Sequence, residues 1–523
     1  MENGGYIVDV GDEKKGEKNG TVVPSHSFEE AISLLPIGKF QYKLLLVGGL
    51  CFMTVMVEIM CVSIILPSMR CDLESTVAQQ GILASAGFLG IVLSSHSMGF
   101  LADTWGRVRT LRLAFTLACI STAISAFSVN IWMLIVFRFL SGFVISGGQA
   151  CVFSMAGEFH GNRTRTRHVT LLSGFLPLSL VYLPTMATFI LPLQIDTMLL
   201  GMKFSSWRIL ILSNCGLSLL TLLGLFFIPE TPKYMLVQGD NNAALETLRW
   251  IFVQNTGKSV AEFPVRHITP QTGGANLANI GGVKDALKMI WSQTKPLFAK
   301  ERYLHTINIC IINMTVYCIS QGLFMWFPTL LNEMVASNVE NPLVCYTLTH
   351  LNDASSTGAS DVCSGNVDIF PFLIIILVGA AFTVFYLIFS FTIDFIGKKN
   401  LILTWLVVSC ICVTLLHWTT NFYVIVTLLT FTMSIGNVGG LVSTISMEFF
   451  PTNINAMGMC FIMMIGRIGA VLGSNFIGVL LFSWCDYTFW AMSGACIVLL
   501  VLCWFLPERK YNKTKKVIHA TTG

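Results

Sequence analysis

The sequence predicts an all-α membrane protein whose twelve transmembrane helices form two pseudo-symmetric six-helix bundles. Composition gives the first reason, because hydrophobic residues make up 54% of the 523 residues and charged residues 11%, where soluble domains carry about 25% charged residues. The second reason is a series of twelve apolar segments, each long enough to cross a bilayer. The third is a short motif that recurs in the two halves at a nearly constant offset.

The apolar segments follow one another with polar turns between most of them. A helix needs about 20 apolar residues to cross roughly 30 Å of hydrocarbon. Each segment should be helical, because an open backbone in lipid leaves donors and acceptors unpaired. The predicted spans are 44–68, 80–102, 110–129, 131–156, 169–193, 206–228, 304–330, 369–392, 400–417, 421–446, 456–482 and 485–506.

These spans divide the chain into two bundles and the segments that connect them. The connector between the sixth and seventh spans is long, and its Gly-, Asn- and Thr-rich part is typical of a flexible segment. The predicted parts are an N-terminal segment 1–43, a first bundle 44–230, a connector 231–303, a second bundle 304–506 with a loop 331–368, and a tail 507–523.

Basic residues predict the orientation of the spans, because short loops rich in Lys and Arg remain cytosolic. Both termini are therefore expected in the cytosol and loop 331–368 on the opposite side, in the plasma membrane or an intracellular vesicle. The loop residues that favour this orientation are Arg107, Arg109, Arg163, Arg165, Lys398 and Lys399.

Several classes of function lack support in the sequence. The net charge of +4 is small, and no basic stripe with interleaved aromatic residues indicates a nucleic-acid partner. No phosphate-binding loop, paired zinc ligands or Ser-His-Asp arrangement indicates an enzyme, a metal site or a cofactor. The expected partners are the lipid bilayer, a small organic solute and, for a coupled carrier, protons; the chain is expected to be a monomer.

The loop between the second and third spans has the composition of a conformational gate. Glycine permits a tight turn and close backbone approach, while a carboxylate and a guanidinium can pair with each other or with a helix end and latch one state. The alternative interpretation is that these charges only set the topology. The predicted gating residues of this loop are Gly99, Asp103, Gly106, Arg107 and Arg109.

A weaker copy of this loop occurs in the second half, at Asp394, Gly397 and Lys398. Asp394 follows Asp103 by 291 residues, and the two glutamates that come after the two loops are 290 residues apart. Such an offset indicates an internal duplication. The residues predicted to latch the cytosolic ends are Glu158, Arg165 and Glu448.

Three charged residues fall inside predicted spans. Glu58 lies in the middle of the first span, where an ionised carboxylate costs at least about 2.5 kcal/mol. Arg138 in the fourth span lies at a depth at which it can pair with Glu58. Arg467 in span eleven has no acidic residue at its depth and can contact an anionic or carbonyl-bearing solute. These three form the predicted substrate or coupling site, and the alternative is a structural role, such as hydrogen bonding to helix carbonyls.

Two further sets of residues carry weaker predictions. Cys345 and Cys363 share the long extracytosolic loop, where a disulfide is compatible with an oxidising compartment, although two loop cysteines need not be close. A group of mostly aromatic residues is predicted either to line a cavity or to serve as packing and lipid-interface anchors. This group is Tyr182, Tyr317, Gln321, Phe324 and Trp326.

Two short motifs resemble those of the major facilitator superfamily: the sequence from Gly99 to Arg107, and Arg138-Phe-Leu-Ser-Gly142. Longer stretches resemble the synaptic vesicle glycoprotein 2 family and related organic ion transporters. These stretches are Phe28-Glu-Glu-Ala-Ile, Gly38-Lys-Phe-Gln-Tyr-Lys43, Pro229-Glu-Thr-Pro-Lys-Tyr-Met, Glu448-Phe-Phe-Pro-Thr452 and Gly466-Arg-Ile-Gly-Ala470. The resemblance implies the major facilitator fold and a rocking transporter. It also implies a gating role for Asp103, Gly106 and Arg107, a cavity charge at Arg138 and coupling at Glu58.

The chain departs from the family pattern at several positions. Ser390 replaces a glycine of the second loop motif, Asn455 replaces the arginine expected after Glu448, and Val55 replaces an acidic residue. Loop 331–368 is also far shorter than the luminal domain of the synaptic vesicle glycoproteins. Two hypotheses therefore remain: a transporter of a small organic solute that works by alternating access, with or without protons, and a non-transporting protein that uses the fold as a binding scaffold.

Overall fold

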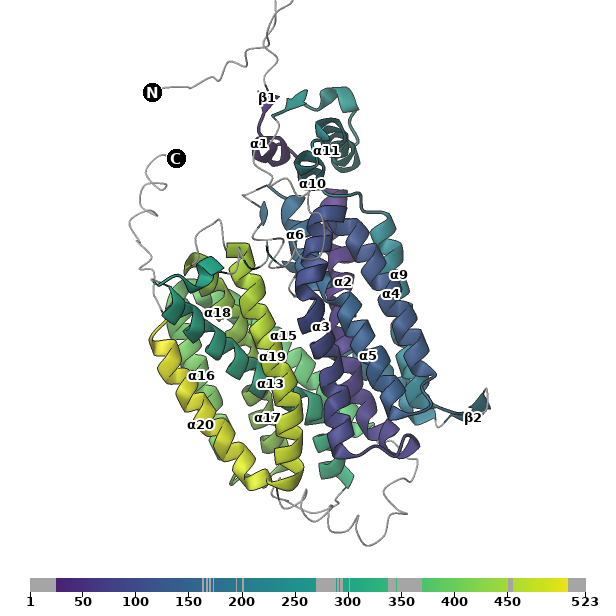
Figure 1. The fold of residues 1–523 in the computed structure, drawn as a ribbon, viewed down its shortest axis with the longest axis vertical. Helices are drawn as coiled ribbons and strands as arrows, with labels where there is room; N and C mark the ends of the chain where they lie inside the picture. Colours follow the sequence, from purple (N-terminus) through teal and green to yellow (C-terminus); the bar gives the residue numbers. More distant parts are fainter. Residues whose placement is uncertain are drawn as a thin grey trace, which may run out of the picture.

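The computed structural model describes most of the chain between residues 25 and 506 (Figure 1). The segments outside this description within that range are 162–163, 166–167, 169–170, 173, 194, 200–201, 270–287, 289–290, 292–294, 301, 337–344, 346–368 and 450–454. The described helices form two bundles side by side, the first drawn in purple and blue and the second in green and yellow.

The first bundle is built from long apolar helices with conventional caps. Thr76 caps α3 by accepting a hydrogen bond from the Gln79 amide, and Asn130 caps α5 by accepting one from the Met133 amide. The helices of this bundle are α2 (Lys39–Asp72), α3 (Val77–Trp105), α4 (Arg107–Ala126), α5 (Ile131–Ile145), α6 (Gly147–Glu158), α8 (Ser179–Ile190) and α9 (Ser206–Phe226).

The second bundle repeats this order of elements. Its helices α13 and α19 approach closely because Gly469 and Gly473 have no side chain; a Cβ at either position would collide with a carbonyl oxygen of α13. The helices of this bundle are α13 (Tyr303–Ala336), α15 (Phe370–Ile396), α16 (Lys398–Leu415), α17 (Phe422–Met433), α18 (Gly436–Phe449), α19 (Asn455–Ser483) and α20 (Cys485–Trp504).

Three predicted spans are interrupted where the sequence predicted continuous helices. The span 131–156 breaks at Ser146, between α5 and α6, and the span 421–446 breaks at residues 434–435, between α17 and α18. These two breaks lie about 290 residues apart, which is the offset of the repeat. Within span 169–193, residues 174–178 form turns before α8 begins, because Pro177 has no amide hydrogen to donate within a helix.

Ten of the described helical segments are long and apolar enough to cross a membrane, and two shorter apolar helices, Ile131–Ile145 and Ser179–Leu193, occupy the places of spans four and five. The all-α class is confirmed, and the count of twelve spans stays a prediction. The two described sheets are two-stranded: β1 (Ser25–His26) pairs in parallel with β4 (His267–Ile268), and β2 (Asp196–Leu199) pairs with β3 (Met202–Ser205) in antiparallel register.

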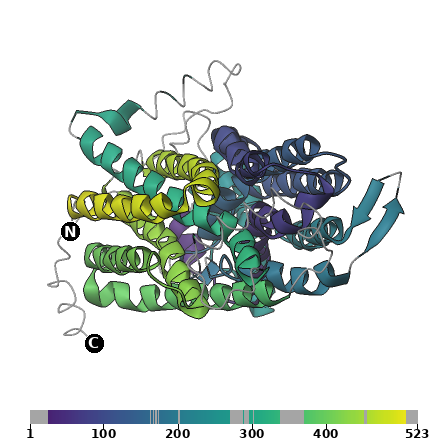
Figure 2. The same cartoon turned by 90° about the horizontal axis from the view of Figure 1, so that it is seen from below.

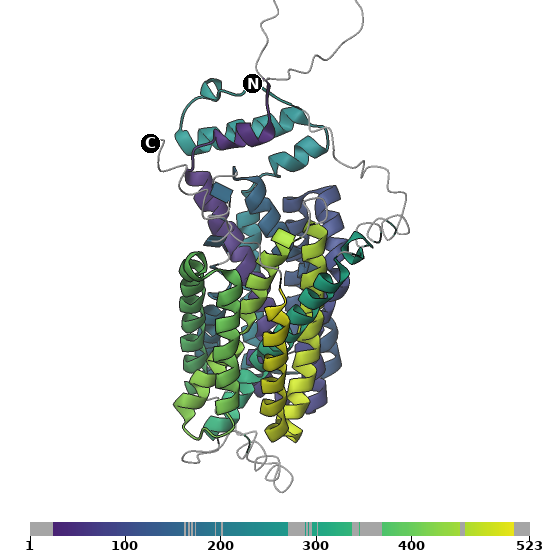
Figure 3. The same cartoon turned by 90° about the vertical axis from the view of Figure 1, so that its left-hand side faces the viewer.

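Both described chain ends lie on one face, which we call the termini face. A layer of short helices covers the first bundle there, made of α1 (Phe28–Ser33), α10 (Pro232–Val237) and α11 (Asn241–Thr256) (Figure 3). Asn255 at the end of α11 holds the start of α2: its Oδ1 accepts from the Phe40 amide at 3.0 Å, and its Nδ2 donates to the Pro36 carbonyl at 2.8 Å. The connector and the N-terminal segment therefore pack as one layer.

The opposite face carries the β2–β3 hairpin, which projects from the first bundle (Figure 2), and we call it the hairpin face. Asp72 at the end of α2 holds the base of this hairpin: it accepts hydrogen bonds from the Ser205 hydroxyl and the Trp207 indole, and pairs with Lys203 at 3.4 Å.

A disulfide on the hairpin face corrects the predicted pairing. Cys345 bonds to Cys485, the first residue of α20, with their Cα atoms 5.3 Å apart. The sequence suggested Cys363, which lies outside the described residues, because it shares a loop with Cys345. Helix packing brings Cys485 next to Cys345 although the two are 140 positions apart, and spacing within the loop cannot predict such a contact.

Candidate functional site

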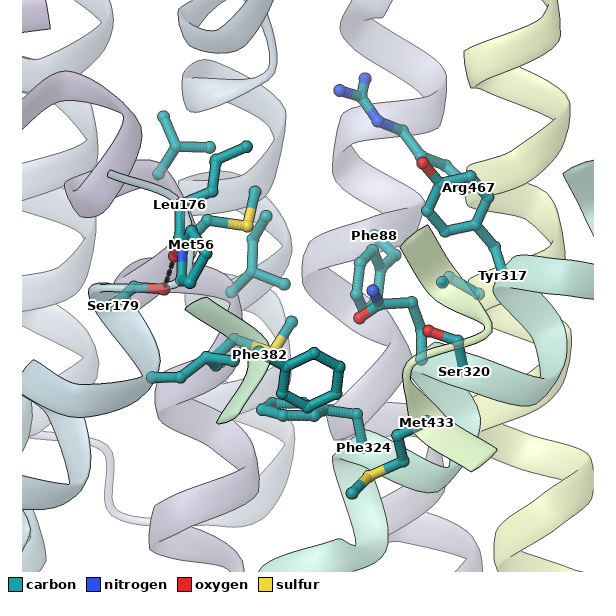
Figure 4. A pocket seen from close by; sticks show the side chains of 18 of the residues that line it. Met56, Phe88, Leu176, Ser179, Tyr317, Ser320, Phe324, Phe382, Met433 and Arg467 are labelled. Carbon is teal, nitrogen blue, oxygen red and sulfur yellow. Dashed lines mark hydrogen bonds between the residues drawn. The ribbon is translucent and has the colours of Figure 1, made fainter. Parts of the chain in front are cut away.

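A cavity of about 240 Å³ lies between the two bundles (Figure 4). The first bundle contributes residues of α2, α3, α8 and the α5–α6 break, and the second contributes residues of α13, α15, α17, α18 and α19. Both helix breaks reach the cavity, since Ser146 and Gly436 line it. Irregular backbone within a membrane is tolerated where it faces a cavity, so these breaks mark the cavity as a candidate binding site.

The cavity is polar toward the termini face and apolar toward the hairpin face. Arg467, Tyr317 and Asn437 lie nearer the helix ends on the termini face than Phe324 and Met433, which are further along their helices. Figure 4 shows Arg467 and Tyr317 at one end of the cavity and Phe324, Phe382 and Met433 at the other. Among the described lining residues, Arg467 alone carries a charge.

Arg467 also links the two bundles. Its Nη1 donates to the Ser95 hydroxyl of α3 at 3.0 Å, across the interface. Arg467 therefore lines the cavity between the bundles, and its contact with Ser95 is one that the sequence did not indicate. Its predicted role in binding a solute stays a prediction. Of the predicted aromatic group, Tyr317, Gln321 and Phe324 line the cavity. Trp326 is instead buried against α19, where its indole donates to the Ser474 carbonyl at 2.7 Å, and Tyr182 is absent from the described lining.

Glu58 and Arg138 form a buried ion pair inside the first bundle, away from the central cavity. Glu58 Oε2 lies 3.3 Å from Arg138 Nη1, and each side chain is only 2% exposed. The same oxygen accepts hydrogen bonds from the hydroxyls of Thr122 at 2.7 Å and Ser141 at 3.2 Å. Arg138 also donates to Ser125. The pairing of Glu58 with Arg138 agrees with the prediction, but neither side chain is among the described residues of the central cavity.

The two oxygens of Glu58 have different surroundings. Oε2 is saturated by three donors, whereas Oε1 is buried and has no hydrogen-bond partner within the described part of the chain. Burying an unpartnered carboxylate oxygen is costly. A small void of about 10 Å³ is lined by Glu58 and Arg138, so the residue that carries the unpartnered oxygen adjoins space on the scale of a single water molecule.

The predicted gating loop forms a tight turn between α3 and α4. Gly106 has φ of +111°, a conformation that favours glycine. Arg107 pairs with Glu158 at 3.2 Å, and the Ser154 hydroxyl donates to the same Glu158 oxygen. Arg107 and Glu158 are thus brought together at the termini face. The structure shows no close approach at Gly99, because a Cβ there would meet no atom of the described residues within 4 Å.

Glu230, which the sequence did not mark as functional, lies under this loop. Its carboxylate accepts hydrogen bonds from the backbone amides of Val108 at 3.0 Å and Arg109 at 3.2 Å, and so caps the start of α4. A Cβ on Gly106 would lie 2.5 Å from Glu230 Oε2, which is a second reason for glycine at this turn. Arg109 itself is exposed and takes part through its backbone. Glu230 belongs to the Pro229-Glu-Thr motif, which in the sequence alone indicated a family resemblance but no structural role.

The latch prediction implied that Arg165 pairs with Glu158, but the structure shows a different partner for Arg165. Its Nη2 lies 3.0 Å from Glu29 of α1, and its Nε donates to the Gly157 carbonyl. Arg107 occupies the carboxylate that Arg165 was expected to use. The N-terminal helix is therefore tied to the loop that follows α6.

Two buried histidines lie at the same end of the first bundle. The rings of His160 and His168 stack with centroids 4.1 Å apart. Burial lowers the pKa of His160 to about 4, although its hydrogen bond to the Ala156 carbonyl opposes this change. His160 Nε2 has no partner among the described groups, so a proton there would be buried without an acceptor.

The second copy of the loop is described in part. Gly397 has φ of +86° between α15 and α16, so the turn recurs, and Lys398 begins α16. The side chains of Asp103, Asp394 and Glu448 lie outside the description, and their predicted gating and latch roles stay predictions.

A contact that the sequence did not suggest joins the bundles on the hairpin face. Arg70 near the end of α2 lies 3.5 Å from Glu333 near the end of α13. On the same half, a Cβ at Gly379 of α15 would lie 2.9 Å from Leu180 of α8. The bundles are thus held together at this face.

A family model described as the Major Facilitator Superfamily matches residues 48–349 and 369–521. Among curated proteins, mouse synaptic vesicle glycoprotein 2B is 25% identical over 63% of this chain and 51% of its own length. The synaptic vesicle 2-related protein of Xenopus laevis is 31% identical over 46% of this chain and 43% of its own length. The chain thus spans about half the length of the curated relatives it matches.

Solved structures show the same fold at low identity. The Escherichia coli xylose transporter XylE, in a partially occluded inward-open conformation, aligns with a TM-score of 0.65 at 14% identity, covering 90% of this chain and all of that one. The nucleoside transporter NupG aligns with a TM-score of 0.56 at 13% identity, with coverage of 90% and 100%.

Proposed function

The chain belongs to the major facilitator superfamily, and we propose that it carries a small organic anion across a membrane by alternating access of its two bundles. It is a multi-pass integral membrane protein. In this proposal the bundles span residues 44–230 and 304–506, and they rock about the central cavity. The curated relatives are matched over only part of their length, so the transport activity rests on the features of this chain.

The observation that carries the proposal is the polarity of the central cavity. Arg467 provides a positive charge beside Tyr317 and Asn437, while Phe324, Phe382 and Met433 provide an apolar wall. A carboxylate accepts hydrogen bonds from a guanidinium in a water-poor site, and a flat apolar body packs on aromatic rings. A volume near 240 Å³ suits a small molecule. A small aromatic or branched carboxylate satisfies all three conditions.

We assign the termini face to the cytosol. The basic loops of the sequence favour this orientation. The Cys345–Cys485 disulfide on the hairpin face supports it, because disulfides persist in extracellular or luminal compartments. The plasma membrane and a vesicle membrane both fit this orientation.

Protons are the coupling ion in this proposal, and Glu58 is the residue that binds them. A buried carboxylate beside an arginine changes its pairing when it gains a proton. Glu58 Oε2 is saturated, whereas Oε1 is buried without a partner among the described residues, and Oε1 is the atom that accepts the proton in this proposal. Arg138 then interacts less strongly with Glu58, which provides a link between protonation and helix packing.

The test is uptake by the purified protein in liposomes with an imposed pH gradient and a mixed pool of small carboxylates, read by mass spectrometry. We expect one or more aromatic carboxylates to accumulate, and to stop accumulating when the gradient is collapsed. Glu58→Gln should abolish accumulation while exchange of labelled for unlabelled solute continues. Binding without any flux, in protein shown to be folded, would instead support the scaffold hypothesis.

A further inference from the structure

The wall between the central cavity and the Glu58 void is one residue thick. Of the described residues, Ile59 alone lines both hollows. On the two neighbouring helices, consecutive residues face the two sides: Gly87 faces the void and Phe88 the cavity, and Ile145 faces the void and Ser146 the cavity. Helix α3 and the junction of α5 with α6 therefore each place adjacent residues on opposite sides of a partition that Ile59 of α2 completes.

The chemistry on the two sides of the partition differs. The void is lined by Glu58 and Arg138, and Glu58 Oε1 has no partner among the described atoms. A buried polar atom without a partner needs either water or a proton. The central cavity can hold solvent, and Ile59, only 6% exposed, is the apolar side chain that lines both hollows among the described residues.

We propose that Ile59 is a hydrophobic gate through which Glu58 exchanges protons with water in the central cavity. This inference rests on the proposed proton coupling. A hydronium ion or hydrated proton in the cavity passes Ile59 into the void. One O–H bond of the hydronium breaks, an O–H bond forms on Glu58 Oε1, and a neutral water remains. The reverse step returns the proton to the cavity.

The location of Ile59 explains how one cavity serves both solute and proton. The break between α5 and α6 falls at Ser146, which lines the cavity next to the void-lining Ile145, so in this proposal relative movement of the two half-helices changes the gap beside Ile59. A solute that packs against Ile59 from the cavity side also covers the route to Glu58. Proton exchange is therefore possible before the solute binds and is blocked while the solute is bound, which would keep proton and solute together as the bundles change state.

The test measures access to Glu58 directly and does not depend on transport. Purified full-length protein is treated with a water-soluble carbodiimide, which modifies protonated carboxylic acids, and the adduct on Glu58 is quantified by mass spectrometry. Ile59→Ala should increase the rate of modification roughly tenfold, the change that about 1.4 kcal/mol off a barrier produces. Ile59→Val, which removes a single methyl group, should also increase the rate of modification, by less than Ile59→Ala. This milder variant keeps the test valid if the alanine variant misfolds.

Two matched controls lie beside Ile59 on α2. Met60 lines only the cavity and Val62 lines only the void, so Met60→Ala and Val62→Ala should leave the modification rate within about twofold of the parent. An unchanged rate in both folded Ile59 variants, or an equal increase in Val62→Ala, would overturn the gate. Failure of solute uptake with a raised modification rate would reject the proposed transport and leave the gate intact.

Discussion

The two bundles handle charge in opposite ways. The first bundle hides Glu58 and Arg138 among its own helices, each side chain 2% exposed. The second bundle places Arg467 against the cavity that the bundles share. At the repeat offset of 290 to 291 residues, Arg138 corresponds to Leu428 or Leu429, both apolar. The duplicated halves have therefore diverged in the position of their charges while keeping the same order of helices.

This difference suggests a division of labour. A buried ion pair is expensive to maintain in a membrane, and its retention in the first bundle is what the proposed proton-binding role of Glu58 would require. A charge on a cavity wall keeps some contact with solvent and can bind a solute directly. Each of the following predictions tests one side of this comparison.

The largest expected effect is on the stability of the first bundle. Arg138→Ala leaves Glu58 buried without its cation, and should lower the free energy of unfolding by about 3–5 kcal/mol. Removing both partners, as in Glu58→Leu with Arg138→Met, should cost less, because no unpaired charge remains. Unfolding in detergent gives both values. Arg467→Ala is the matched control from the second bundle, and an equal loss there would break the comparison.

The next effect is on the affinity of the cavity for anions. Truncating one partner of a hydrogen-bonded charge pair costs about 2 kcal/mol or more, so Arg467→Ala should raise the concentration of a transported carboxylate at half-maximal uptake roughly 30-fold. Arg467→Lys, which keeps the positive charge, should weaken the affinity for the carboxylate less than Arg467→Ala. Met463→Ala removes a lining residue one turn away on the same helix and should have a small effect; unchanged carboxylate uptake by Arg467→Ala would exclude the proposed anion site.

A third prediction concerns acid. The pKa of His160 falls from 6.5 to about 4 in the folded protein, so the unfolded chain binds more protons between these values, and stability is lost as the pH decreases through this window. We expect a loss of up to about 2 kcal/mol between pH 7 and pH 5. His160→Gln should remove most of this dependence in thermal unfolding curves. If His160→Gln keeps the full dependence of stability on pH, groups other than His160 cause that dependence.

The smallest effect is expected at the contact between the bundles. The Arg70–Glu333 pair is partly exposed, so Glu333→Gln should cost at most about 1 kcal/mol. It should also favour opening of the hairpin face. When Glu333→Gln is combined with Met433→Cys, the introduced cysteine should react with an impermeant maleimide about three times faster than in Met433→Cys alone. Lys203→Gln breaks a similar pair with Asp72 inside one bundle and should not change this reactivity. Equal changes in both variants would exclude a gating role for Arg70.

The sequence predicted the helices well because their signal is local. Each span is an apolar segment of nearly fixed length, and bilayer thickness selects that length. The pairing of Glu58 with Arg138 was also predictable, since two charges at similar depth in one bundle have few other partners. The breaks at Ser146 and at residues 434–435 were missed, because no proline marks them.

Contacts between distant segments could not be predicted in this way. Arg165 binds Glu29 because the N-terminal helix α1 packs against the loop after α6, and nothing in either local sequence indicates that packing. Glu230 caps α4 from 122 positions away. The same reason explains the disulfide, where loop spacing favoured Cys363 and the packing of α20 presented Cys485 instead.

That disulfide has a consequence for how the protein is made. Cys485 is the first residue of α20, the last described helix, and its partner precedes it by 140 residues. During synthesis the bond can form only after the polypeptide as far as Cys485 has left the ribosome and its cysteine has reached the far side of the membrane. Its appearance in a pulse-labelled chain, seen as a mobility shift on a non-reducing gel, therefore dates the insertion of α20.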